Sequence, residues 1–364
     1  GVCLGDLILG LSACSTGDAR RGNGPRRPYD PGQPPPVRRL RGQRVRRRLT
    51  LALWAVFTLV FSSISAPVSA QNSLRVALFH TGLGRDGPGI LLRDIRRDEA
   101  DVLIARDAIA SLRPDILLLL DIDWDLNDTT LLALMSSLSD AGHPMPHHFA
   151  PRPNSGMATG LDLDGDGRLG TADDAQGWAR FAGSGGMALL SRWPIDTENL
   201  VDHTSFLWRD LPDARLPQRN GQVFPSEAVY AIQRLASTAA WEVPVQVRGH
   251  PLTLMAYHAG PPAFGGSENR NFNRNADETA FWRYRLDGLL GPPLTTPFVL
   301  LADANLDPVG GDGDHAEIQA LLAHPALQDP QPVGEFPADG TQRRDTAFWR
   351  DGPGALRVEY ALPS

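Results

Sequence analysis

Short apolar runs, separated by polar, Gly-rich or Pro-rich segments, recur along the chain from residue 74 onward. The clearest runs lie at 116–120 (ILLLL) and 298–302 (FVLLA). An unbroken run of this length is typical of a strand that is covered on both faces of its sheet, so both segments predict buried strands. We expect further strands at 74–79, 187–190, 243–247, 252–258 and 356–362.

Longer stretches place their apolar residues three and four positions apart, which is typical of amphipathic helices. They predict helices at 89–112, 129–141, 277–290 and 315–322. Several predicted strands follow one another too closely to hold a crossover helix between them, which favours mixed sheets over purely parallel winding. The pattern therefore indicates an α/β (α+β) fold.

The first 70 residues have a different pattern. An arginine-rich block at 38–48 precedes an apolar run at 49–61 and a small-residue segment that ends at Ala70. This order is typical of a secretory signal peptide at 38–70, cleaved near Ala70, so we expect a periplasmic or extracellular protein. A bilayer span needs roughly 20 apolar residues, so no permanent membrane span is expected. Residues 1–37 are interpreted as a disordered or wrongly translated leader.

The remaining segment, 71–364, has about the size of one large domain. Its composition excludes some classes of function. Residues 1–70 hold 11 of the 35 arginines but three of the 42 acidic residues, which leaves 24 basic against 39 acidic residues and a net charge of −15. A surface this acidic repels polyphosphate, so sequence-independent clamping of long DNA is not expected. Both cysteines, Cys3 and Cys14, precede the cleavage point, which excludes a catalytic thiol or a disulfide from the mature part.

One acidic segment, 162–173, has the spacing of an EF-hand calcium loop. Aspartates occupy loop positions 1, 3, 5 and 12, and Gly167 occupies position 6, where such loops turn sharply. The expected Ca²⁺ ligands are Asp162, Asp164, Asp166, Asp173 and the backbone carbonyl of Arg168. No helix pair flanks the segment, so we interpret it as a stabilising calcium loop. An acidic turn without metal is the alternative.

Five segments, in order, resemble the motifs of the endonuclease/exonuclease/phosphatase superfamily, the deoxyribonuclease-I-like proteins. They are the strand ends at His80, Asp121 and His258, then Asp303-Ala-Asn305, and Arg357-Val-Glu359-Tyr360. The resemblance spans 74–364 and implies a four-layer sandwich of two mixed β-sheets flanked by helices. It also implies a divalent-metal-dependent phosphoester hydrolase, a phosphodiesterase or nuclease, whose substrate is a small molecule or nucleic acid. We find no indication of a protein partner.

The resemblance implies a role for each of these polar residues. Asp121 would hold a catalytic Mg²⁺ or Mn²⁺, which would neutralise a nonbridging phosphate oxygen. Asp303 would orient or deprotonate water, Asn305 would donate to the phosphoryl oxygens, and His258 would stabilise charge that grows in the transition state. The catalytic set also includes the two residues that close the first and last motifs, His80 and Glu359.

A polar segment at 267–275 follows His258 and is interpreted as the substrate loop. Its donors are Arg270, Asn271, Arg274 and Asn275, which suit phosphate or sugar oxygens. Alternatively, its arginines pair with the neighbouring carboxylates of Glu268, Asp277 and Glu278.

The sequence departs from the family pattern at several motif positions. His80 stands for Asn, Asp121 for Glu, Ala302 for Gly and Glu359 for Asp, and the family's final Ser-Asp-His segment does not occur before Ser364. We therefore expect terminal strands to be missing and turnover to be impaired, since a misplacement of about 1 Å can cost roughly 100-fold in rate. The alternatives are a noncatalytic calcium-binding exported module on the same scaffold and a glycosidase that uses Asp121 and Asp123.

Overall fold

The computed structural model describes residues 8–9, 73–335 and 340–364. All of them belong to one unit of the chain, formed by Gly1–Cys14 and Ser73–Ser364. The predicted signal peptide, and all but two residues of the predicted leader, lie outside the described residues. None of the helices in the described part is long and apolar enough to cross a membrane.

The first of the two large sheets carries the N-terminal half of the fold. Its strands are β1 (Ile8–Leu9), β2 (Val76–His80), β3 (Ile116–Ile122), β4 (His147–Phe149) and β5 (Gly186–Ser191), in the order β1-β2-β3-β5-β4. The first three run parallel, whereas β5 is antiparallel to both β3 and β4. The sheet is therefore mixed, as the close spacing of the predicted strands indicated.

The second large sheet carries the C-terminal half. It consists of β6 (Val201–Asp202), β9 (Ala240–Val247), β10 (His250–His258), β11 (Phe298–Asp303) and β16 (Glu359–Pro363), in the order β16-β11-β10-β9-β6. Only β10 and β11 pair in parallel. Consequently β10 and β11 end at the same edge of the sheet.

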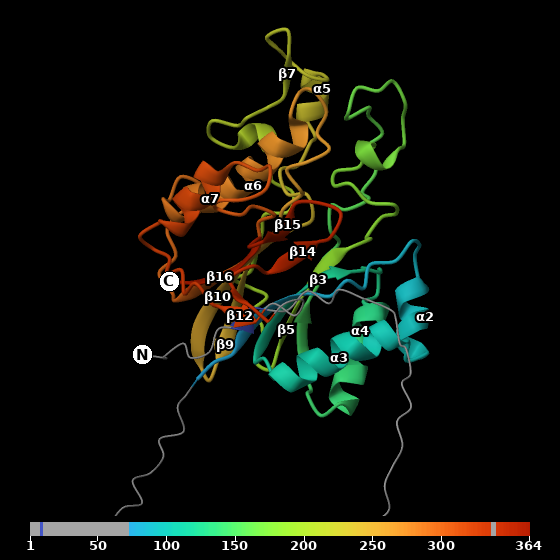
Figure 1. Cartoon of the computed structure of the whole chain (residues 1–364), viewed down its shortest axis with the longest axis vertical. Helices are drawn as coiled ribbons and strands as arrows, with labels where there is room; N and C mark the ends of the chain where they lie inside the picture. Colours follow the sequence, from blue (N-terminus) through green and yellow to red (C-terminus); the bar gives the residue numbers. More distant parts are fainter. Residues whose placement is uncertain (1–7, 10–72, 336–339) are drawn as a thin grey trace, which may run out of the picture. The chain divides into compact units, whose positions relative to one another are not determined.

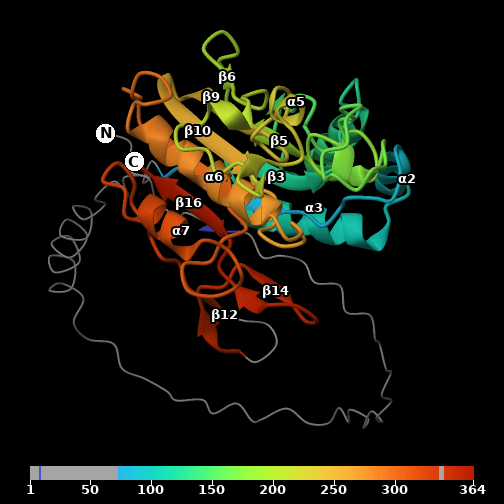
Figure 2. The same ribbon diagram turned by 90° about the horizontal axis from the view of Figure 1, so that it is seen from above.

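Helices cover the outer face of each sheet (Figures 1 and 2). Next to the first sheet lie α2 (Ile90–Arg96), α3 (Ala100–Leu112) and α4 (Thr129–Asp140); next to the second lie α6 (Arg270–Leu286) and α7 (His315–Leu322). The remaining elements are short. They include the helix α5 (Glu227–Tyr230) and the 3₁₀ turns η1 (Ala172–Asp174) and η2 (Trp208–Asp210). Three pairs of short antiparallel strands complete the fold: β7 (Gln218–Arg219) with β8 (Gln222–Val223), β12 (Gly334–Glu335) with β13 (Gln342–Arg343), and β14 (Ala347–Trp349) with β15 (Gly354–Leu356).

Three hydrophobic clusters fill the spaces between these layers. Along β3, Leu118 faces the second sheet, whereas its neighbours Leu117 and Leu119 face the helices α2 to α4. Along β11, Leu301 faces the first sheet and Leu300 faces the side of α6 and α7. Successive side chains of a strand point to opposite faces, so a strand between two cores needs an unbroken apolar run. The predicted four-layer sandwich is confirmed.

Three of the predicted helices have different boundaries, and α4 ends at Asp140, one residue before its predicted end. The stretch at 89–112 forms two helices, because the chain turns at Asp98, whose φ is 54°. The helix predicted at 277–290 instead begins at Arg270 and ends at Leu286. The helix predicted at 315–322 is confirmed at both ends.

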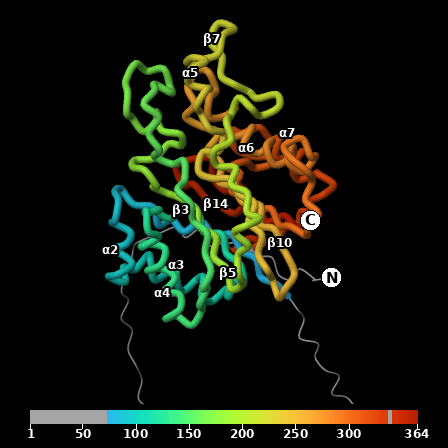
Figure 3. The backbone as a smooth tube through the Cα atoms, turned by 180° about the vertical axis from the view of Figure 1, so that it is seen from behind, coloured from blue at the N-terminus to red at the C-terminus, as the bar shows by residue number. Residues whose placement is uncertain are grey.

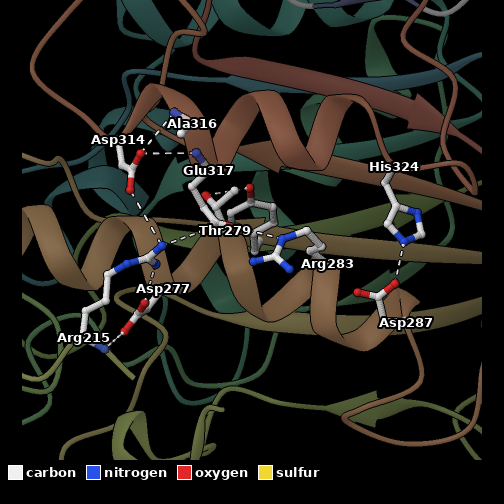
Figure 4. Close-up of polar contacts among 10 residues, drawn as sticks. Arg215, Asp277, Thr279, Arg283, Asp287, Asp314, Ala316, Glu317 and His324 are labelled. Carbon is white, nitrogen blue, oxygen red and sulfur yellow. Dashed lines mark hydrogen bonds and ion pairs between the residues drawn. The ribbon is translucent and has the colours of Figure 1, made fainter. Parts of the chain in front are cut away.

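An ion-pair network joins α6 to α7 (Figure 4). Arg215 Nη1 lies 2.7 Å from Asp277 Oδ1 on α6, and Arg215 Nη2 lies 2.7 Å from Glu317 Oε2 on α7. Arg283 Nε also contacts Glu317, at 3.0 Å. Asp277 and Glu317 are almost fully buried, so these arginines satisfy carboxylates that water cannot reach.

Candidate active site

Two neighbouring strands of the second sheet, β10 and β11, end in a polar residue, and β16 beside them begins with one. In the strand register His258 is the partner of Asp303, and Asp303 is the partner of Glu359. His258 Nε2 lies 3.3 Å from Asp303 Oδ2. The edge of the sheet therefore carries an imidazole and two carboxylates in one row.

The first sheet contributes His80, the last residue of β2. Its ring centroid lies 5.8 Å from that of His258, with the two rings nearly perpendicular. Ligand atoms of His80, His258 and Asp303 all lie within 4.8 Å of one another. Side chains from both sheets thus converge at one end of the sandwich.

Asn305 holds the turn that follows β11. Its backbone N–H donates to Asp303 Oδ1 at 3.2 Å, and its side-chain Nδ2 donates to the carbonyl of Ala259 at 2.8 Å. Its φ of 49° lies in the left-handed region, which Asn tolerates better than most residues. The predicted phosphoryl donor therefore also fixes the loops after β10 and β11.

Asp121 lies at the same end, on the first sheet. Its φ is 55°, and the pairing of β3 with β5 shifts register between Leu120 and Ile122. This irregularity re-aims a side chain at the end of a strand. A Cβ on Gly84 would collide with Asp121 Oδ1, so this position of the carboxylate requires glycine at residue 84.

Burial shifts the proton affinity of the converging side chains. It raises the pKa of Asp303 to about 6 and lowers the pKa of His258 to about 4. Burial also lowers the pKa of His80. Burial and the nearby charge of Asp303 both raise the pKa of Glu359, whose Oε2 has no hydrogen-bond partner. Near pH 7 both imidazoles are therefore neutral, the form that binds metal ions.

A cavity of about 840 Å³ lies beside this cluster and is lined by Asp121 and His258. The aromatic side chains of Trp178 and Phe264 line it and are largely exposed, at 62% and 93%. Long connections between β4 and β5 and between β6 and β9 project at this end of the fold (Figure 3). The size and the lining suit a small organic ligand.

The prediction of a substrate loop is wrong in its secondary structure. The four predicted donors lie in the first turns of the helix α6: Arg270, Asn271, Arg274 and Asn275. Arg274 donates to four backbone carbonyls, those of Gln176, Arg234, Leu235 and Ala236. Asn275 Nδ2 donates to the carbonyls of Gly260 and Ala304. Both residues are buried, so their polar atoms hold the surrounding loops together. Arg270, Asn271 and Arg274 still line the cavity.

The alternative pairing of these arginines with local carboxylates holds for Arg274, whose charge interacts with that of Glu278 one helical turn away, whereas the other two carboxylates pair elsewhere. Glu268 pairs with Arg219, and Asp277 pairs with Arg215. Glu278 accepts hydrogen bonds from the backbone N–H groups of Ser237 and Gly260. Carboxylates and arginines of this segment thus reach distant parts of the chain.

The acidic loop at 162–173 places three carboxylates together. Ligand oxygens of Asp162, Asp164 and Asp166 lie within 4.8 Å of one another. Asp173 lines the cavity, and its carbonyl accepts a hydrogen bond from Arg270 Nη1 at 3.4 Å. The loop therefore contacts a wall of the cavity through its last predicted ligand.

Two carboxylates beside the site, Asp123 and Glu278, are buried, which the sequence analysis did not predict. Asp123 accepts hydrogen bonds from the backbone N–H groups of Arg85 and Gly185, and burial raises its pKa to about 6. Glu278 lines the cavity, and burial raises its pKa to about 7. The only sequence signal for Asp123 was its position two residues after Asp121; Glu278 gave none, since Glu is common on exposed helices.

Comparison with known proteins places this geometry in a family. The model of the "Endonuclease/Exonuclease/phosphatase family" matches residues 71–364. The chain therefore belongs to the endonuclease/exonuclease/phosphatase family, whose enzymes cleave phosphoric esters and typically use divalent metals. No curated protein matches the sequence.

Solved structures with a similar fold are distant in sequence. An endonuclease/exonuclease/phosphatase family protein from Leptotrichia buccalis is 12% identical, with a TM-score of 0.42 over 80% of this chain and 87% of that one. Sphingomyelinase C from Streptomyces griseocarneus is 15% identical, with a TM-score of 0.44 over 79% and 82%. A mannosyl-6-phosphatase from Bacteroides thetaiotaomicron is 14% identical, with a TM-score of 0.41 over 80% and 85%.

The residues at the site fit a divalent cation. Asp121 lines the open cavity, and His80, His258 and Asp303 bring nitrogen and oxygen ligand atoms together. The Nδ1 atom of His258 and the Oε2 atom of Glu359 are buried without hydrogen-bond partners. Buried polar atoms normally find a partner, so these two indicate a polar group that the protein does not supply.

Proposed function

We propose that the protein is an exported, metal-dependent hydrolase of small phosphodiesters. The observation that carries this proposal is the convergence of His80, His258 and Asp303 beside a cavity that Asp121 also lines. Residues separated by more than 200 positions meet there, each at the end of a buried strand. Groups that bind a cation, orient water and contact a phosphate are thus within reach of one ligand.

The roles of the side chains follow from their positions. A divalent cation held near Asp121 would neutralise a nonbridging phosphoryl oxygen and the leaving oxygen. Asp303, fixed by the Asn305 N–H, orients water for attack on phosphorus. His258 faces Asp303 and the cavity, where it donates a hydrogen bond to the phosphoryl group as negative charge grows.

The cavity favours a small phosphodiester over long nucleic acid. Segment 71–364 carries a net charge of −15, which repels polyphosphate, whereas a single phosphate needs only the local cation. Trp178 and Phe264 offer exposed aromatic faces at the cavity, against which a flat or apolar ester group packs.

The test is hydrolysis of bis(p-nitrophenyl) phosphate and of DNA by the purified protein, with Mg²⁺, with Mn²⁺ and with EDTA. We expect turnover of the small diester that EDTA abolishes, and little turnover of duplex DNA. Asp121→Asn removes the negative charge from the proposed cation ligand and is expected to need a higher Mg²⁺ concentration. Absence of EDTA-sensitive turnover on both substrates would falsify the proposal.

We also propose that the 162–173 loop binds Ca²⁺ and stabilises the cavity wall. The motif spacing and the clustering of Asp162, Asp164 and Asp166 support this role. Three carboxylates this close repel one another, and Ca²⁺ prefers such oxygen ligands. A noncatalytic calcium-binding module is the second candidate function, distinguished by calcium binding without hydrolysis.

Addition of Ca²⁺ is expected to raise the melting temperature of the protein, because an ion that binds only the folded state stabilises it by mass action. At about 100 times the dissociation constant the gain is about 2.7 kcal/mol. Differential scanning fluorimetry measures the shift. The double substitution Asp162→Ala, Asp164→Ala should abolish it, whereas Asp210→Ala, in an exposed 3₁₀ turn outside the loop, should not. An equal shift in the loop variant would rule out this site.

A further inference from the structure

One face of α6 forms a wall of the cavity. Arg270, Arg274 and Glu278 follow one another at four-residue spacing along this helix, and all three line the cavity. Residues four positions apart lie on the same face of a helix, one turn above the other. Each residue advances a helix by about 1.5 Å, so about 12 Å of helix axis separates Arg270 from Glu278. The wall can therefore contact more of a ligand than its reacting phosphate group.

Glu278 lies at the end of this wall that adjoins the strand ends. Its Oε2 accepts the backbone N–H of Gly260 at 2.9 Å, in the loop directly after β10. Arg270 lies at the other end, where its guanidinium donates to the carbonyl of Asp173 and to Gln233 Oε1. A ligand whose phosphate lies at the end of β10 would thus reach Arg270 with a different group.

Arg270 is the least satisfied of the arginines that line the cavity. Its two hydrogen bonds are long, at 3.4 and 3.3 Å, and both acceptors are neutral. Its Nε is buried without a hydrogen-bond partner. The other arginines of the cavity have either carboxylate partners or several backbone carbonyls: Arg85, Arg180 and Arg274.

The charge of Arg270 is only partly compensated by the protein. Burial lowers the pKa of its guanidinium, although Asp164, Asp173 and Asp174 attract it from the acidic loop. Ca²⁺ bound to that loop would neutralise these charges and weaken the attraction. An arginine nevertheless stays charged in proteins, and its planar fork pairs best with a phosphate or a carboxylate. The partner that Arg270 lacks is therefore an anionic group.

We propose that Arg270 binds a second anionic group of the substrate, a phosphate or a carboxylate, while the scissile phosphodiester lies beside Asp121 and His258. The substrate class is then a small phosphodiester that carries another negative charge about two helical turns away. This inference deepens the proposed function and rests on it for the reacting phosphate. Arg270 contacts no reacting atom, so its role is to determine specificity.

Binding of matched ligands tests this contact without any turnover. Octane-1,8-diol bisphosphate carries a phosphate at each end of its chain, whereas 8-hydroxyoctyl phosphate carries only one. Isothermal calorimetry compares their affinities for the full chain with saturating Mg²⁺ and Ca²⁺. We expect the bisphosphate to bind about 10- to 100-fold more tightly, the factor that hydrogen bonds to charged groups contribute. Ethane-1,2-diol bisphosphate is too short to span the wall and should show no such gain over 2-hydroxyethyl phosphate.

Variants assign the preference to a residue. Arg270→Gln should abolish the preference for the long bisphosphate, because the amide has no charge and no planar fork. Arg270→Lys keeps the charge but not the fork and should retain part of the preference. The matched control is Arg180→Gln, which removes the same charge from the same cavity, where Asp86 already pairs with it, and should keep the preference. Thermal melting reports whether each variant is folded, and Arg270→Lys serves if Arg270→Gln is not.

The outcomes separate this inference from the proposed function. The two kinds of anion are distinguished by 8-phosphonooxyoctanoic acid, in which a carboxylate replaces one phosphate. Equal affinity for all three long ligands, or no binding of any of them, would overturn the inference, as would an equal loss of preference in Arg180→Gln. A preference that depends on Arg270, without hydrolysis of bis(p-nitrophenyl) phosphate, would support the anion site and reject the hydrolase. EDTA-sensitive hydrolysis without the preference would do the reverse.

Discussion

Replacement of Asp303 by asparagine is expected to lower kcat/KM for phosphodiester hydrolysis by about 100- to 10,000-fold, the range of a lost acid–base group. Asparagine keeps the size of the side chain and still accepts the Asn305 N–H, so the fold should survive. What is lost is the negative charge that orients water and attracts a cation. Steady-state assays of the two proteins at equal metal concentration measure the effect.

The pH profile gives a second readout for the same variant. Burial raises the pKa of Asp303 to about 6, so the wild-type rate should rise as pH increases through 6 and the carboxyl group ionises. Asp287→Asn is the control, because Asp287 is exposed and pairs with His324 directly after the last residue of α6 (Figure 4). An Asp303→Asn enzyme with wild-type kcat/KM would remove Asp303 from the mechanism.

Replacement of Arg274 by alanine is expected to have the largest effect on stability. Its guanidinium is buried and donates to four backbone carbonyls from two separate loops. Without it the carbonyls of Arg234 and Leu235 lose this donor, at about 1–3 kcal/mol for each group left unsatisfied. The carbonyls of Gln176 and Ala236 each keep one other side-chain donor. We expect a total loss of about 3–5 kcal/mol, which corresponds to roughly 6–15 °C in melting temperature for a protein of this size.

Chemical denaturation and thermal melting both measure this loss. Arg152→Ala is the matched control, since Arg152 is exposed and should change stability by less than about 0.5 kcal/mol. Arg274→Lys keeps the charge but not the planar fork and should recover only part of the stability. If Arg274→Ala instead melts with the wild type and loses only substrate affinity, the sequence-based role in substrate binding is restored.

The strands and their polar ends were predictable from local sequence. His80, Asp121, His258 and Asp303 each follow an apolar run, and a polar residue at that position marks the point where a buried strand reaches a loop. The carboxyl ends of neighbouring strands in α/β sheets gather ligands, so their convergence could be expected. The register of β10 and β11, which pairs His258 with Asp303, agrees with it.

The first turns of α6 were not predictable in the same way. Their buried side chains are polar, including Arg274, Asn275 and Glu278, so the apolar spacing that marks a buried helical face is missing. Each is buried where it forms a hydrogen bond with a distant backbone group, such as the carbonyl of Gln176 or the N–H of Ser237. Such partners lie in other parts of the chain, and no local pattern reports them.

The site is divided between two sheets that pack against each other through their side chains. His80 ends a strand of one sheet, while His258 and Asp303 end strands of the other, and aliphatic residues such as Leu118 and Leu254 fill the interface between them. Interiors packed like crystals shift when a core side chain changes size. A truncation such as Leu254→Ala would therefore move one histidine relative to the other and change the metal affinity. The affinity for metal thus reports how the two sheets pack against each other.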